Sequence, residues 1–342
     1  MKTSSIADTV RIWVWGISSL LIAITVSPLA FNAGKALSEL SVTKDFNGAV
    51  NKIAAWSGAA QLKDFFAICW VIAAVGLLLP LVEWLRLGNE RIGRKPWSLR
   101  LPHGATASQT GGQPVRPNSW GMLHGILGFV MTFCCFILIG YALVKAGSFS
   151  WVEDTSALKR DFWADFGLML MVAYIVEFFF RCAVLGVFLR AMKPLLAIAL
   201  AGMMFASVQF VMSGFTNYPM VDDETLTPFK LAGMLFLSGD FLERAFVVFL
   251  PWFAFGCVLG WARWRTASLW LPVGLLMGWL LSGMVFSKAA NPIPIRDKVI
   301  SLVASESLHN GLIPLLGVLV VGGLVHVITH GYSLKSKSAQ AD

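Results

Sequence analysis

Eight apolar stretches, each long enough to cross a bilayer as a helix, constrain the fold of this chain more than any other feature. They cover residues 12–31, 65–87, 120–144, 164–189, 194–215, 245–262, 268–287 and 311–330. About 20 apolar residues, rising ~1.5 Å each, span the hydrocarbon core of a bilayer. The chain is also 57% hydrophobic and only 13% charged, far fewer charges than a soluble domain carries. We therefore predict an all-α, polytopic transmembrane helical bundle with about eight spans.

The charges of the connecting segments predict how the spans are oriented. One set of connections is rich in bases and poor in acids, and it contains Lys2, Arg11, Arg86, Arg91, Arg94, Lys95, Arg100, Arg116, Arg190, Lys193, Arg263, Arg265, Lys335 and Lys337. The other set balances its bases with acids such as Glu39, Asp45, Glu153, Asp154, Asp222, Asp223 and Glu224. Because basic loops stay in the cytoplasm, we expect a plasma (inner) membrane protein with both termini cytoplasmic. The net charge of +8 follows this topology, so no nucleic-acid partner is predicted.

The chain divides into two predicted regions. Residues 1–118 form a two-span region with an outer amphipathic segment at 32–64 and a Gly/Ser-rich, flexible cytoplasmic loop at 88–118. Residues 119–342 form the remaining bundle. Within it, the charged and broken stretch 229–244 is too short to span, and we expect a re-entrant or interfacial helix that leads into the next span.

Two charges lie in the middle of the fourth apolar stretch. Glu177 and Arg181 are four residues apart, so on a helix they share a face and can pair. A charged side chain at the bilayer centre costs about 2.5–3.5 kcal/mol. Both should therefore point into the bundle, either as a structural ion pair or as one wall of an intramembrane site.

Cysteine and histidine give no sign of a metal centre. The five cysteines all lie in apolar stretches, and no Cys/His spacing is typical of zinc; they are Cys69, Cys134, Cys135, Cys182 and Cys257. His326 and His330 are four residues apart but have no carboxylate beside them, so we interpret them as polar side chains at an interface. His103 belongs to the predicted flexible loop, His124 to the start of the third span and His309 to an outer loop. We predict no metal and no cofactor.

Three motifs in order resemble those of one family. The segment V-E-F-F-F-R-C at 176–182 resembles the E-E-x-x-F-R-G signature of the CPBP family, which contains CAAX prenyl proteases and bacteriocin-processing intramembrane proteases. F-A-S-V-Q at 205–209 takes the place of its F-x-x-x-H motif. The T-A-S-L-W context within 260–279 is similar to its closing motif. The resemblance covers about 165–285 and implies a CAAX-protease-like core.

The resemblance also implies where the chemistry would lie and what this chain lacks. In active members the first Glu of the pair activates a water, the second-motif His assists it, and a final His and Asn stabilise the oxyanion. Here these positions carry Val176, Gln209, Leu276 and Leu280. Valine and leucine neither accept a proton nor donate to an oxyanion, and glutamine cannot act as a base.

The family-motif positions that keep a polar group are Glu177, Arg181 and Gln209, and we interpret them as structural here. Three hypotheses follow. The first is a catalytically inactive, membrane-embedded partner or scaffold that binds membrane or envelope proteins, or a transmembrane or lipidated peptide. The second is an active endopeptidase with displaced groups, using Glu177 with Gln209 or His124. The third is a transporter, which is disfavoured because few polar groups lie in the spans.

Overall fold

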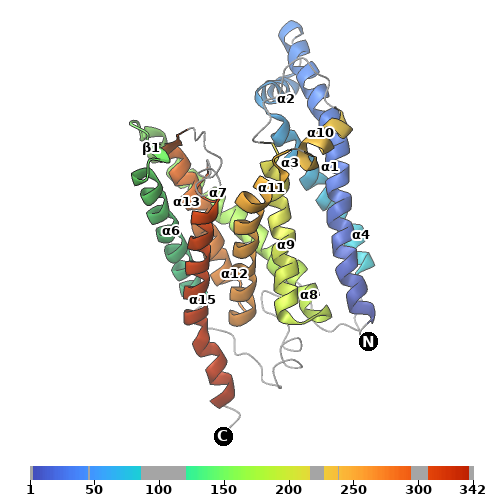
Figure 1. The fold of residues 1–342 in the computed structure, drawn as a ribbon. Coiled ribbons are helices and arrows are strands. Elements are labelled where there is room, and N and C mark those ends of the chain that lie inside the picture. Colours follow the sequence, from blue (N-terminus) through green and yellow to red (C-terminus); the bar gives the residue numbers. More distant parts are fainter. Residues whose placement is uncertain are drawn as a thin grey trace. The chain divides into compact units, whose positions relative to one another are not determined.

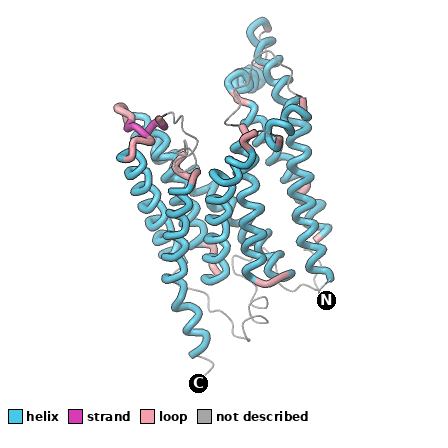
Figure 2. The backbone as a smooth tube through the Cα atoms, in the orientation of Figure 1, coloured by secondary structure: helices cyan, strands magenta, loops and turns pink. Residues whose placement is uncertain are grey.

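The structure is a computed structural model that describes residues 3–44, 47–85, 121–215, 227–237, 239–293 and 307–338. Their regular secondary structure is helical apart from one short pair of strands, and short loops and turns connect the elements (Figure 2). Eight of the described helices are long and apolar enough to cross a membrane, as the sequence predicted. The loop predicted at 88–118, with His103, lies outside the described residues.

The candidate spans match the predicted ones in order and position. They are Ala7–Thr43, Leu62–Leu81, Gly121–Lys145, Arg160–Leu189, Pro194–Ser213, Phe241–Thr266, Trp270–Ala289 and Leu312–His330. The largest difference is at the first span, where helix α1 (Thr3–Thr43) continues well beyond residue 31. The first third of the outer segment predicted at 32–64 is thus a continuation of the span.

The chain forms two compact units. Unit 2 comprises Ala7–Arg91 and Phe210–Phe241, and unit 1 comprises the rest. Unit 2 contains α1, α2 (Gly48–Ala59), α3 (Leu62–Gly76), α4 (Leu78–Trp84) and α10 (Pro228–Phe236). Unit 1 contains α6 (Gly121–Lys145), β1 (Phe149–Trp151), α7 (Ser156–Glu177), η1 (Phe178–Val184), α8 (Leu185–Ala191), α9 (Pro194–Ser213, which ends in unit 2), α11 (Phe241–Arg244), η2 (Ala245–Phe249), α12 (Leu250–Thr266), α13 (Trp270–Ala289), β2 (Ala290–Pro292) and α15 (Leu312–Ser338).

In unit 2, α1 and α3 are joined by two indole hydrogen bonds. Trp15 Nε1 donates to the carbonyl oxygen of Ala74 at 3.2 Å, and Trp70 Nε1 donates to Ser19 Oγ at 3.2 Å. A buried cluster packs between them, and α10 contributes Leu231 and Leu235 to it; its other members are Ala23, Ile24, Phe31, Ala60, Leu62, Phe65, Phe66 and Val211. The stretch predicted at 229–244 is therefore helical, in two separate pieces, α10 and α11.

In unit 1, α6 packs along α13 (Figure 1). A Cβ at Gly274 would overlap the carbonyl group of Gly125, and one at Gly278 would lie 2.6 Å from the carbonyl oxygen of Phe129. Small residues let transmembrane helices approach this closely, and van der Waals contact then holds them. The glycines of α13 therefore fix its position against α6.

The contacts of unit 1 define two ends of this bundle. At the strand end, β1 and β2 pair antiparallel directly after α6 and α13, with Phe149 opposite Pro292. At the Trp270 end, Gly121 at the start of α6 contacts Trp270 at the start of α13. Helices α6 and α13 therefore run parallel. Helix α12 ends at Thr266, just before α13 begins at the Trp270 end, so α12 runs antiparallel to both.

Candidate functional site

The helix that carries the family-like motif changes its geometry at Glu177. α7 ends there, and η1 continues as a π-helix from Phe178 to Val184. At the end of this segment the backbone N–H of Leu185 donates to the carbonyl oxygen of Phe180, five residues earlier. Single π-helical turns within α-helices occur frequently at functional sites. The π-helical segment after Glu177 is therefore a candidate site.

Glu177 and Arg181 form the ion pair that their spacing predicted. Arg181 Nε lies 3.2 Å from Glu177 Oε2, and the exposed fractions of the two side chains are 1% and 0%. Neither carboxylate oxygen accepts a well-directed hydrogen bond from a described residue. The contact is therefore one of charge, and both charges point into the bundle as expected.

Helices α9 and α12 hold the Arg181 guanidinium in place. Its Nη2 donates to the carbonyl oxygen of Gly256 at 3.4 Å, and its Cζ lies 4.8 Å from the ring centroid of Phe205. Gly256 makes this possible, because a Cβ there would lie 2.9 Å from the Cα of Gly202. Arg181 thus connects three helices that are distant in sequence.

A second buried guanidinium lies near the pair. Arg263 is 1% exposed, and its Nη2 lies 3.8 Å from the Sγ of Cys182. It is also close enough to Glu177 to attract the carboxylate. One carboxylate therefore interacts with two buried guanidiniums, and this group of charges was not predicted as a whole because Arg263 was assigned to a loop.

The other family-motif positions lie on the neighbouring helices. Gln209 is half-buried on α9, one turn after Phe205, and makes no hydrogen bond with a described residue. On α13, Leu276 is buried and Leu280 is half-buried. Val176 is half-buried on α7.

The histidine considered as a displaced catalytic group lies at the start of α6. His124 is 9% exposed and lies between Gly121 and Gly125, whose backbones both pack against Trp270. The two oxygens of Glu177 accept no hydrogen bond from it. The structure therefore brings Glu177 and Arg181 together, but it does not add Gln209 or His124 to the pair through a hydrogen bond.

His309 is another buried polar residue that the sequence did not single out. Its backbone lies in the connection before α15, as expected, but its side chain is only 8% exposed and stacks on Trp279 with ring centroids 4.4 Å apart. Gly283 leaves the space for it, since a Cβ there would overlap the imidazole. The backbone N–H of Gly311 donates to the carbonyl oxygen of Val247 at 2.8 Å, within the π-helical turn η2, and this bond anchors the connection to α12.

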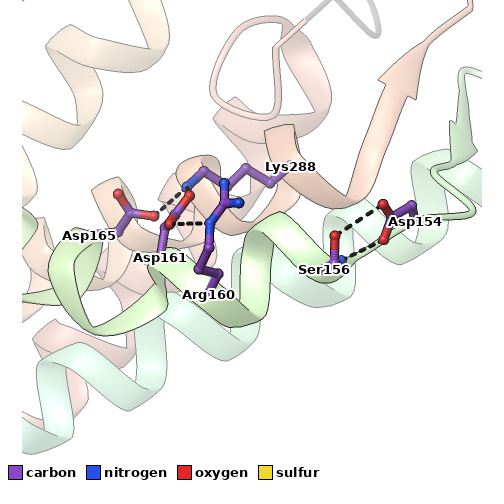
Figure 3. A network of polar contacts seen from close by, with 6 residues as sticks. All are labelled: Asp154, Ser156, Arg160, Asp161, Asp165 and Lys288. Atoms are coloured by element: carbon purple, nitrogen blue, oxygen red, sulfur yellow. Dashed lines mark hydrogen bonds and ion pairs between the residues drawn. The ribbon is translucent and has the colours of Figure 1, made fainter.

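A polar network fixes the strand end of α7 against α13 (Figure 3). Lys288 Nζ donates to Asp165 Oδ2 at 2.5 Å and lies 3.9 Å from Asp161 Oδ2. Asp161 also pairs with Arg160 at 3.0 Å. The network thus joins the first half of α7 to the last turn of α13.

The histidine pair at the end of α15 has the predicted spacing. The rings of His326 and His330 are 5.8 Å apart, and both residues are exposed. Within the described ranges, no group of three or more His, Cys, Asp and Glu side chains is arranged to hold a metal ion. All five cysteines are free thiols.

Comparison with known proteins places the site within a family domain. Residues 159–282 match the family described as "Type II CAAX prenyl endopeptidase Rce1-like". The match covers less than half of the 342 residues and agrees closely with the core predicted at 165–285. No curated protein and no solved structure matches the chain. Residues 159–282 of this multipass membrane protein therefore form an Rce1-like domain.

Proposed function

We propose that this protein is a catalytically inactive, membrane-embedded binding partner for other membrane or envelope proteins. The observation that carries the proposal is the environment of the Glu177 carboxylate. It is wholly buried and paired with Arg181, and it accepts no hydrogen bond from any described histidine. In this environment the carboxylate neutralises a guanidinium and holds the bundle together.

The side chains at the other family-motif positions support this proposal. Hydrolysis of a peptide by water needs a base for the water and donors for the oxyanion. The corresponding motif positions carry Val176, Gln209, Leu276 and Leu280. Three of the four side chains are hydrocarbon, and the Gln209 amide can donate a hydrogen bond but cannot act as a base, so no base for the water is supplied at these positions.

The partner we propose is a transmembrane or lipidated segment of another membrane protein. A domain related to peptidases that act within the membrane already has a surface suited to such a segment. Loss of the hydrolytic groups removes turnover but leaves that surface in place. We place the protein in a plasma (inner) membrane, with both termini in the cytoplasm, because its basic connections lie on that side.

The test is affinity purification of the tagged protein from its native membranes in mild detergent, followed by mass spectrometry. We expect one membrane protein to co-elute in stoichiometric amount after washing. A tagged, unrelated multipass protein from the same membranes controls for proteins carried over in micelles. Recovery of the protein alone, or of the same proteins as in the control, would contradict the proposal.

One observation favours a second candidate, an intramembrane endopeptidase with displaced groups. Both oxygens of Glu177 lack a directed hydrogen bond, so a water that reached the carboxylate would find a free acceptor. In that case Glu177→Gln should abolish cleavage of a membrane-embedded peptide substrate while the protein level stays unchanged. Under our proposal the wild type shows no cleavage, and Glu177→Gln lowers the protein level.

A further inference from the structure

A basic and aromatic patch lies where α12 and α15 reach the Trp270 end of unit 1. We call it the α12–α15 patch; it consists of Trp261, Trp264, Arg265, His326 and His330. The three residues of α12 and the two of α15 belong to helices that pack along each other (Figure 1). The patch is separate from the Glu177–Arg181 pair.

The contacts of Arg265 hold its guanidinium over the aromatic rings. Its Cζ lies 5.5 Å from the ring centroid of Trp261 and 6.0 Å from that of Trp264. Its Nη2 donates to the carbonyl oxygen of Thr329 on α15 at 3.3 Å. The guanidinium is therefore held in a fixed position between the two helices, and less freedom is lost when it binds a ligand.

The charge of Arg265 is not neutralised by a described residue. Its partners are a carbonyl group and two indole rings, and no described carboxylate forms an ion pair with it. The indole N–H of Trp261 donates to no described group and is buried, so this side chain contributes its ring to the patch. Next to them, His326 stacks on Trp261 with centroids 6.0 Å apart, and His330 follows one turn later, both exposed. The patch therefore offers an uncompensated, half-buried guanidinium and two exposed imidazoles, and its described members include no acid.

The position of the patch along the spans fits the membrane surface. Arg265 lies in the last turn of α12, and His330 is the last residue of the candidate span in α15. Tryptophan is enriched at the level of lipid headgroups, because its ring is apolar and its N–H is polar. A ligand at this level comes from the headgroup region and not from the hydrocarbon core.

We infer that the α12–α15 patch binds the phosphate of an anionic phospholipid. Arginine presents several N–H groups in a planar fork that suits phosphate oxygens. Tryptophan and the helix surface below it receive the glycerol backbone and the first part of the acyl chains. Basic pockets between transmembrane helices on the cytoplasmic side bind anionic headgroups, and the charge distribution of the sequence predicts that this end is cytoplasmic.

The experiment titrates lipid into the full-length protein in a neutral detergent and follows the midpoint of thermal unfolding. We expect phosphatidylglycerol to raise the midpoint in a saturable manner, while phosphatidylcholine gives a much smaller shift. A ligand that binds only the folded state stabilises it in this way. Inorganic phosphate, which tests whether a soluble anion is sufficient, should give no comparable shift in the midpoint.

The variants assign the effect to the patch. Arg265→Gln should raise the half-saturating concentration of phosphatidylglycerol about fivefold, the factor expected for one basic side chain at an anionic surface. Trp264→Phe keeps the charge and tests the indole if Arg265→Gln does not fold. Lys145→Gln is the matched control, because Lys145 lies over Tyr141 at 5.5 Å in the last turn of α6, at the opposite end of the bundle.

Three results would overturn the inference. The two lipids could shift the midpoint equally, which would mean that the headgroup charge is not recognised. Lys145→Gln could weaken the response as much as Arg265→Gln, which would mean a general effect of charge. Inorganic phosphate could reproduce the shift, which would identify a soluble anion as the ligand.

Discussion

The imidazole of His309 lies flat on the indole of Trp279, with ring centroids 4.4 Å apart and planes inclined by 13°. Phe136 and Trp252 stand edge-on to the same imidazole at 5.8 and 6.0 Å. Burial among these uncharged rings lowers the pKa of His309 from 6.5 to about 3. The folded protein therefore contains the neutral form of His309 at any pH near neutrality.

The first prediction is a loss of stability on acidification. Between pH 6.5 and about 3 the unfolded chain binds a proton at His309 that the folded chain does not bind. Stability is therefore highest above pH 6.5 and falls as the pH drops below it. At pH 5 the loss is about 2 kcal/mol for this one group. Thermal unfolding in detergent between pH 8 and pH 5, followed by tryptophan fluorescence, measures it.

Two variants separate His309 from the other titratable groups. His309→Phe should be less dependent on pH over this range than the wild type, because its ring cannot be protonated. His326→Phe, which replaces an exposed histidine, should keep the wild-type dependence. If the midpoint of thermal unfolding depends on pH equally in the wild type and in His309→Phe, His309 is not buried in its neutral form.

The second prediction concerns the space that His309 occupies. A Cβ at Gly283 would overlap the imidazole, whereas one at Gly323 on α15 would meet no atom within 4 Å. Gly283→Ala should therefore displace the histidine and destabilise the fold by about 1–3 kcal/mol. Gly323→Ala should be neutral or slightly stabilising, because alanine favours the helix. Equal midpoints of thermal unfolding for the two variants would contradict this arrangement.

The sequence predicted the features that depend on local periodicity. Hydropathy located the eight spans, since crossing a bilayer needs a minimum length of apolar chain. Helical spacing predicted the contact of Glu177 with Arg181, because four residues bring two side chains to one face. Three short motifs located the domain that matches at residues 159–282.

The features that the sequence did not predict depend on contacts between distant segments. His309 was assigned to an outer loop, because its burial depends on the space at Gly283 on α13 and on the hydrogen bond from Gly311 to Val247 in η2, and both Gly283 and Val247 are distant from it in sequence. Arg263 was assigned to a loop because the predicted span ended at residue 262, yet α12 continues to Thr266 and buries it. The proximity of α6 and α13 was missed as well, although Gly274 and its neighbours give a sequence signal in the form of small residues four apart.

The third prediction tests that proximity. Gly274→Ala would place a methyl group against the carbonyl of Gly125 and force α6 away from α13. We expect a loss of about 1–3 kcal/mol in stability and a lower protein level in the membrane. Gly167→Ala, at a position on α7 with no atom within 4 Å of the added Cβ, is the matched control. A Gly274→Ala protein that is as abundant and as stable as the control would contradict the close packing.

The fourth prediction concerns the polar network between α7 and α13. Lys288 and Asp165 are 29% and 20% exposed, so water screens their interaction only in part. Lys288→Met should lower stability by about 1–2 kcal/mol, because it leaves Asp165 without its charged partner. Arg160→Gln should leave the midpoint of thermal unfolding close to that of the wild type, since water screens the Arg160 side chain, which is 78% exposed. If both variants show the same midpoint of thermal unfolding, Lys288 does not hold the helices together.

The fifth prediction addresses the role of the buried pair. Glu177→Leu or Arg181→Leu alone should destabilise the protein by about 3–5 kcal/mol, because each leaves an uncompensated charge in the bundle. Replacing both residues removes both charges, and a buried pair exchanged for hydrophobic residues is often close to neutral in stability. The double variant should therefore recover much of the protein level and thermal midpoint that each single variant loses. Arg263 remains buried beside Cys182 in the double variant, so recovery should be incomplete, since Glu177 also attracts that guanidinium. If the single variants instead keep their stability and lose only a cleavage activity, Glu177 is a catalytic base and the scaffold proposal is wrong.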